Sequence, residues 1–399
     1  MYYQRPCRLH YRIAQAASWV VSAFVFRRKI LRNEIKGKKG PFVVIANHET
    51  ALDFVNLIGM TARPMSFVIS NSFFQSLPIR GFLQKMGVIP KQQFQTAVSD
   101  LKKIKAVIDH GEPVVIYPAG LMCEDGVSTP IPSATYKFLK WLKADVYVAK
   151  TMGTYFVKPK WAKKMRPGRT YMDVYKLFTE EELAQADLAQ VQARTDAALL
   201  FDAYREQENL QIRYRGGSNV EGLQNVLYLC PYCGAEFSVC AEKGNTLRCK
   251  ACGFAHESDH MGFLHPVSDV GEPVRYVSDW SRLIYTRTLE NLRSGKETSL
   301  SSPVTVRMID HAKRKFAEVG QGTLGLSADG FLLEGVLQGQ SVSLSVPIGD
   351  VPTLPFSPGK HLEVQQGGNI YRCVPKDGGL VMKFIHLLKA YYALNHPEA

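Results

Sequence analysis

The chain has 399 residues, of which 46% are hydrophobic and 21% are charged, and its net charge is +13. A chain of this length is too long to fold around one ordinary hydrophobic core, so two or three domains are expected. The aromatic fraction of 11% excludes a disordered basic tail, and the positive charge calls for an acidic partner such as anionic lipid, nucleic acid or a phosphorylated substrate.

The first predicted element is an apolar stretch at residues 14–26, within an N-terminal segment of residues 1–40. It is too short to span a bilayer, which needs about 20 apolar residues. Two arginines before it resemble the start of a signal peptide, but residues 27–29 are basic and no small-residue cleavage site follows. A helix packed on the domain's own core fits the pattern. An interfacial helix fits it equally, with these side chains in lipid: Trp19, Val20, Phe24 and Phe26.

Residues 41–215 alternate short β-rich runs with helical stretches, which predicts an α/β domain around a mixed, largely parallel sheet. Strands are expected at residues 42–45, 67–69, 114–117 and 146–149, and helices at residues 95–109 and from 179 to about 207. The functional side chains of such a sheet lie at the carboxyl ends of its strands. The basic run at residues 158–169 is most simply a solvated face.

The first of these strands ends at Asn47 and His48, and Asp53 follows five residues after the histidine. Histidine suits a general base because its pKa lies near neutrality. A carboxylate then fixes its tautomer and stabilises the imidazolium. On a regular helix, positions five apart point about 140° away from each other. The two side chains can therefore meet only if His48 lies in the turn before the helix and Asp53 reaches back from it.

This His-x-x-x-x-Asp block resembles the first motif of the lysophospholipid acyltransferases, and the resemblance covers about residues 15–210. It implies that His48 and Asp53 transfer an acyl chain from a thioester, on coenzyme A or acyl carrier protein, to a lipid-type acceptor. Backbone amides near Gly120 would hold the oxyanion. The alternative is a catalytically silent lipid-binding or scaffolding protein, in which His48 only caps the first helix.

Two later blocks depart from the family pattern at its phosphate-binding residues. The second block has Gln93 in place of an arginine, with Lys91 nearby, and the third block has Ala119 and Met122 in place of a glutamate and an arginine. The resulting Pro-Ala-Gly also resembles haemolysin-like and ornithine-lipid acyltransferases. Because glutamine and methionine cannot replace a guanidinium fork, we expect an acceptor without a phosphate group. The expected substrate contacts are Asn47, Lys91, Gln93, Tyr117, Ala119 and Gly120.

Residues 226–260 contain two Cys-x-x-Cys-Gly turns, formed by Cys230 and Cys233 and by Cys249 and Cys252. This spacing predicts a zinc ribbon with one structural Zn²⁺ and a reducing compartment. Two redox-active cysteine pairs are the competing interpretation. The loop at residues 238–247 between the turns has only Lys243 as a basic residue, with Arg248 beside Cys249, so we do not expect nucleic acid as the partner.

Residues 275–399 carry short β-type runs with glycine turns and end in a helix from about residue 380 to 394. This order resembles pleckstrin-homology and GRAM domains in topology only. The whole sequence therefore predicts an α/β acyltransferase domain, a zinc ribbon and a β-rich C-terminal domain closed by a helix. We expect a peripheral protein on the cytoplasmic face of a membrane, with membrane lipid and a thioester carrier as partners.

Overall fold

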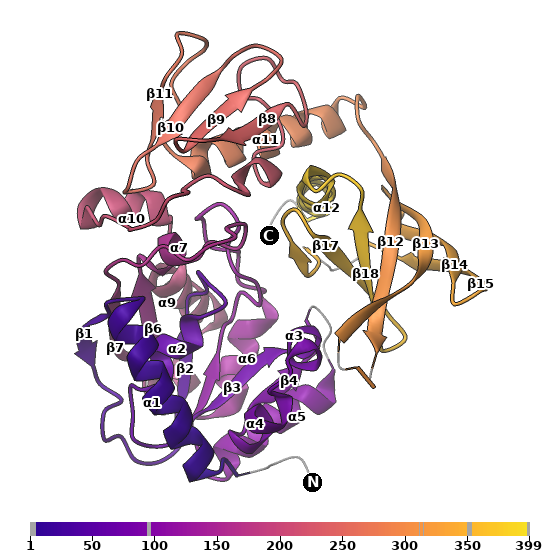
Figure 1. Cartoon of the computed structure of the whole chain (residues 1–399). Helices are drawn as coiled ribbons and strands as arrows, with labels where there is room; N and C mark the ends of the chain where they lie inside the picture. The colour runs from indigo at the N-terminus through magenta and orange to yellow at the C-terminus, as the bar shows by residue number, and fades with distance from the viewer. Residues whose placement is uncertain (1–4, 94–96, 311, 314, 349–352, 397–399) are drawn as a thin grey trace. The chain divides into compact units, whose positions relative to one another are not determined.

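The computed structural model describes residues 5–93, 97–310, 312–313, 315–348 and 353–396 (Figure 1). The chain forms two compact units. Unit 1 comprises Met1–Pro159 and Met165–Gly216, and unit 2 comprises Lys160–Lys164 and Gly217–Ala399.

Unit 1 is built on a seven-stranded sheet in the order β1-β7-β6-β2-β5-β3-β4. Neighbouring strands run parallel, apart from the antiparallel pair β6 and β7. The strands expected from the sequence are β2, β3, β5 and β6, so the predicted largely parallel sheet is confirmed. The strand bounds are β1 Lys29–Asn33, β2 Val43–Ala46, β3 Ser66–Ser70, β4 Ile89–Lys91, β5 Val114–Ile116, β6 Val146–Met152 and β7 Tyr171–Phe178.

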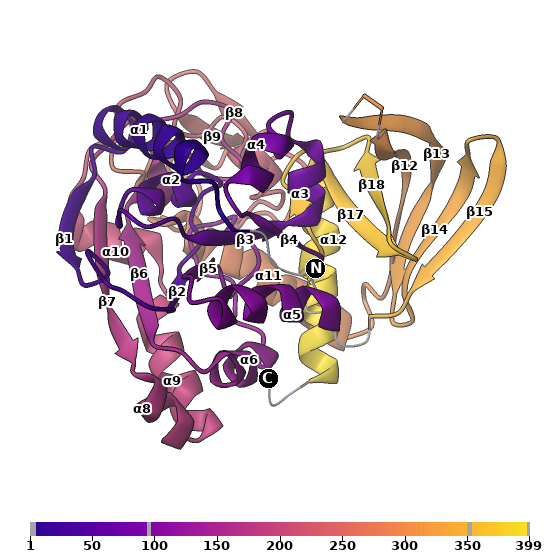
Figure 2. The same cartoon turned by 90° about the horizontal axis from the view of Figure 1, so that it is seen from below.

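Alternate side chains around β2 enter two separate cores, as the two-residue period of a strand dictates. Val43 and Ile45 pack with residues of α5 (Val98–Asp109), α6 (Ala134–Leu142), α8 (Glu180–Gln185) and α9 (Leu188–Leu199). Phe42 and Val44 pack with residues of α1 (Arg8–Phe24), α2 (Asp53–Ile58), α3 (Asn71–Ser76) and α4 (Arg80–Lys85). Figure 2 shows these two helical layers on opposite sides of the strands. The sheet is thus covered on both faces, as a parallel sheet requires.

The helical stretch expected from residue 179 to about 207 is three helices, α8, α9 and α10 (Ala203–Leu210). Each helix is preceded by an N-cap residue whose side chain accepts a hydrogen bond from a backbone N–H of the first turn: Thr179, Asp187 and Asp202. These caps favour new helix starts and explain the breaks. The helix expected from residue 95 begins at Val98 as α5, and residues 95 and 96 lie outside the described residues.

The basic run at residues 158–169 is a solvated face only in part, because Lys163, Lys164 and Arg169 are exposed. Trp161 and Arg166 are buried. Residues 160–164 belong to unit 2, where the Lys160 ammonium lies 3.4 Å from the centre of the Phe356 ring. Aromatic contact and burial, which the charge pattern does not reveal, decide the place of this segment.

Helix α1 buries Tyr11 and two serines, and it exposes five large apolar side chains. Ser18 and Ser22 are buried, and the Ser18 hydroxyl donates to the Val55 carbonyl oxygen at 2.7 Å. Phe26 is fully buried, so its expected place in lipid was wrong. None of the helices in the described part of the chain is long and apolar enough to cross a membrane. The large apolar side chains exposed on α1 are Leu9, Ile13, Trp19, Val20 and Phe24.

Unit 2 contains a four-stranded antiparallel sheet in the order β11-β10-β9-β8. A 3-10 helix, η1 (Leu223–Asn225), precedes it. Helix α11 (Val277–Arg293) follows and was not expected from the sequence. Its Trp280 is fully buried and donates its indole N–H to the Leu229 carbonyl at 2.9 Å, so α11 is part of the core beneath the cysteine turns. The strands are β8 Val239–Glu242, β9 Thr246–Cys249, β10 Ala255–Ser258 and β11 Leu264–Pro266.

The remainder of unit 2 is an antiparallel sheet in the order β15-β14-β13-β12-β18-β17-β16. Helix α12 (Gly379–Asn395) follows it and buries its apolar stripe, including Phe384 and Leu388. The expected β-rich region closed by a C-terminal helix is therefore confirmed. Its strands are β12 Leu300–Asp310, β13 Lys315–Ser327, β14 Gly330–Leu337, β15 Gln340–Val346, β16 Phe356–Ser357, β17 His361–Gln366 and β18 Asn369–Pro375.

Candidate active site

The carboxyl end of β2 brings His48 and Asp53 together. Strand β2 ends at Ala46, and α2 begins at Asp53, so His48 lies in the connecting turn. The Nδ1 atom of His48 lies 2.9 Å from Oδ2 of Asp53. This is the arrangement that the spacing required, with the histidine in the turn and the carboxylate reaching back from the helix.

Backbone amides hold the carboxylate in place. Oδ2 of Asp53 accepts from the N–H of Glu49 at 2.8 Å and from the N–H of Thr50 at 3.0 Å. Asp53 is buried, whereas the His48 side chain keeps 21% of its surface exposed. A buried carboxylate on Nδ1 fixes the tautomer of a neutral imidazole and leaves Nε2 to accept a proton.

The loop after β5 forms one wall beside the histidine. The Tyr117 ring stacks on the His48 ring with centroids 4.4 Å apart. Ala119 and His48 line the same hollow, whose remaining walls are mainly apolar. These walls include Leu121, Ile131, Leu199 and Phe201. A mainly apolar hollow next to a histidine is a candidate contact for an apolar substrate group.

The second and third sequence blocks meet at Gln93 and Gly120. The Gln93 side-chain amide donates to the Gly120 carbonyl oxygen. The Gly120 N–H donates to the Tyr117 carbonyl at 3.0 Å, so this amide is already used within the loop. Lys91 ends β4, burial lowers its pKa, and its ammonium donates to the Gln92 carbonyl at 3.0 Å. The structure thus brings Gln93 to the loop expected to hold the oxyanion.

Asn47 lies in a buried polar cluster next to His48. Its side-chain amide is bonded to Thr151 at the end of β6 and to Glu49. Thr154, in the short helix α7 (Thr154–Val157), contacts Glu49 as well. Sequence reasoning missed Glu49, Thr151 and Thr154. The available signal was an acidic residue directly between the histidine and the aspartate, where a buried turn has little room for a second charge.

The sequence model of the family described as Acyltransferase matches residues 25–159, a segment that contains β1 to β6, His48 and Asp53. The chain carries an acyltransferase domain. The resemblance seen in the sequence motifs is therefore confirmed, and acyl transfer is the chemistry of this domain.

One solved structure similar to this chain is the 1-acyl-sn-glycerophosphate (LPA) acyltransferase PlsC from Thermotoga maritima. The match has 15% sequence identity and a TM-score of 0.41, and it covers 51% of this chain and 78% of that one. No curated protein matches the sequence. The assignment of the acyltransferase domain accordingly rests on the family match and on its own site geometry.

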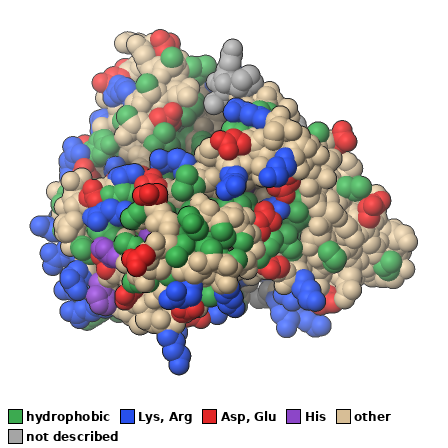
Figure 3. Space-filling view, turned by 90° about the horizontal axis from the view of Figure 1, so that it is seen from above, with side chains coloured by type: hydrophobic (Ala, Val, Ile, Leu, Met, Phe, Trp, Pro, Cys, Tyr) green, Lys and Arg blue, Asp and Glu red, His purple; other side chains and the backbone are tan. Residues whose placement is uncertain are grey.

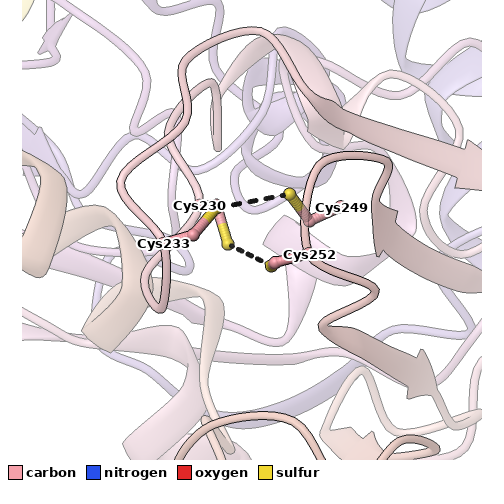
Figure 4. A group of neighbouring side chains, drawn as sticks. All are labelled: Cys230, Cys233, Cys249 and Cys252. Atoms are coloured by element: carbon pink, nitrogen blue, oxygen red, sulfur yellow. Dashed lines mark hydrogen bonds between the residues drawn. The ribbon is translucent and has the colours of Figure 1, made fainter.

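The four paired cysteines lie together outside the acyltransferase domain. Their sulfur atoms all lie within 4.8 Å of one another, with 3.7 Å between Cys230 and Cys252 and 3.8 Å between Cys233 and Cys249 (Figure 4). A tetrahedral Zn²⁺ with bonds of about 2.3 Å places its sulfurs roughly 3.8 Å apart. The cluster therefore fits a zinc ribbon.

Two glycines shape the cysteine turns. Gly234 and Gly253 have φ values of 71° and 82°, in the left-handed region that favours glycine. Their N–H groups donate to the backbone carbonyl oxygens of Cys230 and Cys249. Cys240 lies outside the cluster. His256, four residues after Cys252, is buried, and its Nε2 accepts from the Val274 N–H at 3.1 Å.

Proposed function

We propose that the acyltransferase domain moves an acyl chain from a thioester of coenzyme A or acyl carrier protein to a lipid-type acceptor, with His48 as general base and Asp53 as its orienter. The observation that carries this proposal is the 2.9 Å contact between His48 and the buried Asp53 carboxylate. A base and an orienter are the two groups that the chemistry requires.

In the proposed reaction, Nε2 of His48 takes the proton of the acceptor hydroxyl or amine. The acceptor oxygen or nitrogen attacks the thioester carbonyl, and the carbon–sulfur bond breaks as the tetrahedral intermediate collapses. The imidazolium returns its proton to the leaving thiolate. Asp53 stays ionised and stabilises the imidazolium between these steps. An acyl-transfer assay on purified His48→Ala tests the assignment, because a fully active variant would show that His48 is not the base. Unmodified protein without acyl-transfer activity would favour the catalytically silent alternative.

We also propose that the preferred acceptor carries no free phosphate group. Ala119 and Met122 provide no cation where the resemblance places a phosphate clamp, and Gln93 is bonded to the Gly120 carbonyl instead. Lysophosphatidic acid should therefore accept acyl chains more slowly than an uncharged or amino-acid-linked lipid in a competition assay. Equal rates would contradict this, as would a Met122→Arg and Ala119→Glu double variant that gains nothing with lysophosphatidic acid.

We propose that α1 lies in the surface of an anionic membrane, with the protein bound peripherally on the cytoplasmic face. The support is the exposed apolar face of α1, on which Trp19 is 65% and Phe24 72% exposed. Arg8, Arg12 and Lys29 are exposed along the same segment. Apolar side chains flanked by cations are the features of a helix that lies in a membrane interface.

Trp19→Ala is expected to weaken binding to phosphatidylglycerol-containing vesicles by roughly tenfold. Full burial of a large apolar side chain contributes about 1.5–3 kcal/mol, and about 1.4 kcal/mol is a factor of ten. Salt should weaken binding of the unmodified protein, because the charge attraction is screened. Vesicle co-sedimentation measures both effects.

The matched control is Trp141→Ala, since Trp141 is an exposed tryptophan on α6 of the same domain. Equal losses from both substitutions would contradict the placement of α1 in lipid. Point substitutions are the sharper test, because deletion of residues before Lys36 would also remove β1 and the buried Phe26.

We propose that the cysteine cluster holds one structural Zn²⁺ and serves as a structural or partner-docking module. Arg248, next to Cys249, pairs with Glu242 at 3.1 Å. On the face drawn in Figure 3, lysine and arginine side chains are interspersed with acidic and apolar ones. A nucleic-acid partner calls instead for basic residues clustered on one face.

A further inference from the structure

The turn that carries His48 is fastened to the end of β6 by a ring of buried hydrogen bonds. Its members are the side chains of Asn47, Glu49, Thr151 and Thr154, all of them buried. We propose that this ring positions His48 for catalysis and that Glu49 is its central positioning residue. The inference rests on the function proposed above, because it takes His48 as the base.

Asn47 forms the first half of the ring. Its Nδ2 donates to Oε1 of Glu49 at 2.9 Å and to the Thr151 carbonyl at 2.8 Å. Its Oδ1 accepts from the Thr151 N–H at 2.8 Å and from the Thr151 hydroxyl at 3.1 Å. The amide is therefore fully occupied by protein partners, which makes it a structural tie between β2 and β6.

Glu49 forms the second half. Its Oε2 lies 2.7 Å from the Thr154 hydroxyl and accepts from the Tyr155 N–H at 2.6 Å. The Thr154 and Thr151 hydroxyls lie 3.4 Å apart, which closes the ring. Since Asn47 and Glu49 flank His48 in the chain, the backbone that carries the imidazole is held on both sides.

A third tie comes from the loop after β5, where the Cys123 N–H donates to the His48 carbonyl at 3.2 Å. A buried polar network is costly unless it is fully satisfied, and a satisfied network fixes a single geometry. Placing such a network on both neighbours of the general base determines where Nε2 points. An error of about 1 Å in a reacting group can lower the rate roughly 100-fold.

The charge state of Glu49 agrees with this role. Burial, followed by the charges of Asp53 and Glu206, raises the pKa of Glu49 to about 8, while hydrogen bonds from Thr154 and Tyr155 oppose the rise. Glu49 is therefore mostly uncharged at neutral pH. In this form it can donate its proton to the Thr154 hydroxyl, which can donate onward to Thr151.

Several other groups surround this carboxyl. From α10, Glu206 pairs with Lys150 of β6 at 2.9 Å, which reduces its effect. The Cys123 thiol and the Tyr214 phenol also face Glu49, and its charge contributes to the raised pKa of each. Among these charges, that of Asp53 raises the pKa of Glu49 the most.

The first test compares two substitutions at Thr154. Thr154→Val keeps the shape of the side chain and removes the hydroxyl, so kcat should fall roughly 10–100-fold with little change in KM. Thr154→Ser restores the hydroxyl and should recover most of the lost kcat. The matched control is Thr170→Val, because the Thr170 hydroxyl is also buried and hydrogen-bonded, donating to the Phe26 carbonyl oxygen at 3.0 Å. This variant should keep the kcat of the unmodified protein.

The possible outcomes separate the two hypotheses. If His48→Ala is inactive and Thr154→Val is fully active, the ring inference fails and the proposed function stands. If His48→Ala retains the acyl-transfer activity of the unmodified protein, the proposed function fails, and the ring cannot act by positioning a catalytic base. An equal loss of kcat in Thr154→Val and Thr170→Val would also overturn the inference, because it would show a general effect of losing a buried hydroxyl.

The second test does not depend on activity. The pKa of Glu49 is about 8 in the folded protein, against 4.5 as its ordinary value. Between these values the folded state retains a proton that the unfolded state has lost, so the stability of the unmodified protein decreases as pH rises through this window. Glu49→Gln cannot ionise. Its Tm, relative to that of the unmodified protein, should therefore be higher at pH 8 than at pH 5. A difference that stays constant over this range would show that Glu49 is not the buried acid of the ring.

Discussion

Replacing His48 by alanine is expected to lower the acyl-transfer rate by about 10²–10⁴-fold, the usual contribution of a general base. The acceptor would have to attack the thioester without losing its proton to a positioned group. The fold should be unaffected, because the imidazole is partly exposed and its one charged contact is Asp53 among the described ion pairs. Single-turnover kinetics with a thioester donor, together with circular dichroism, measure the rate and the fold separately.

Asp53→Asn is expected to lower the acyl-transfer rate by a factor in the same range. The asparagine oxygen can still accept from the Glu49 and Thr50 N–H groups, so the turn should remain folded. The amide cannot stabilise an imidazolium, however, and it no longer fixes the tautomer that leaves Nε2 free. This variant therefore separates the electrostatic role of the carboxylate from its structural one.

The control for both substitutions is His110→Ala. His110 lies at the C-terminal end of α5 in the same domain, and it is exposed. Its removal should leave the rate unchanged. If His48→Ala were as active as the unmodified protein, or if His110→Ala were equally impaired, His48 would not be the base.

Cys230→Ser is expected to abolish zinc binding and to unfold the ribbon while unit 1 stays folded. Structural zinc sites contribute about 10–16 kcal/mol of apparent binding free energy, and in such modules this energy is folding energy. Cys230 is fully buried against the core that α11 completes, so the loss of its bond to the metal cannot be replaced by water. Metal analysis by mass spectrometry and limited proteolysis measure the two effects, with one zinc ion per chain expected before substitution.

The matched control is Cys240→Ser, since this cysteine lies close to the cluster without belonging to it. It should retain the metal and the protease resistance of the ribbon. Unmodified protein without zinc, or with iron in a coloured cluster, would contradict the site.

The features predicted correctly from the sequence are those encoded within short segments. The strand before His48 and the five-residue spacing to Asp53 together determine how these two side chains meet. In the same way, the spacing within each Cys-x-x-Cys-Gly turn determines how its two sulfur atoms are placed. The polar ring could not be predicted, because Thr151 and Thr154 are more than a hundred residues from the turn that they hold, at separations of 104 and 105. Only the pairing of β2 with β6 brings them together.

Two other differences between the predicted and the observed structure have local causes. Helix α11 carries buried side chains at helical spacing, among them Val277, Trp280 and Ile284, but serine, aspartate and arginine residues between them dilute the pattern. Phe26 continues the apolar stretch of α1 in the sequence, yet the helix ends at Phe24 and the chain then turns inward. Hydrophobicity alone does not distinguish a side chain beyond the end of a helix from one on its exposed face.

The attachment of α1 has a mechanical consequence for the active site. Gln15 and Ser18 hold α1 through hydrogen bonds to the carbonyl oxygens of Thr61 and Val55, at 2.7 Å each. Val55 belongs to α2, a helix of six residues, about 9 Å long, whose first residue is Asp53. If α1 lies in lipid as proposed, the depth of its apolar face sets the height of the imidazole above the headgroups through this one short rigid element. The bilayer surface would then act as the reference plane for catalysis, and a change in lipid packing that raised or lowered α1 would move the catalytic pair with it.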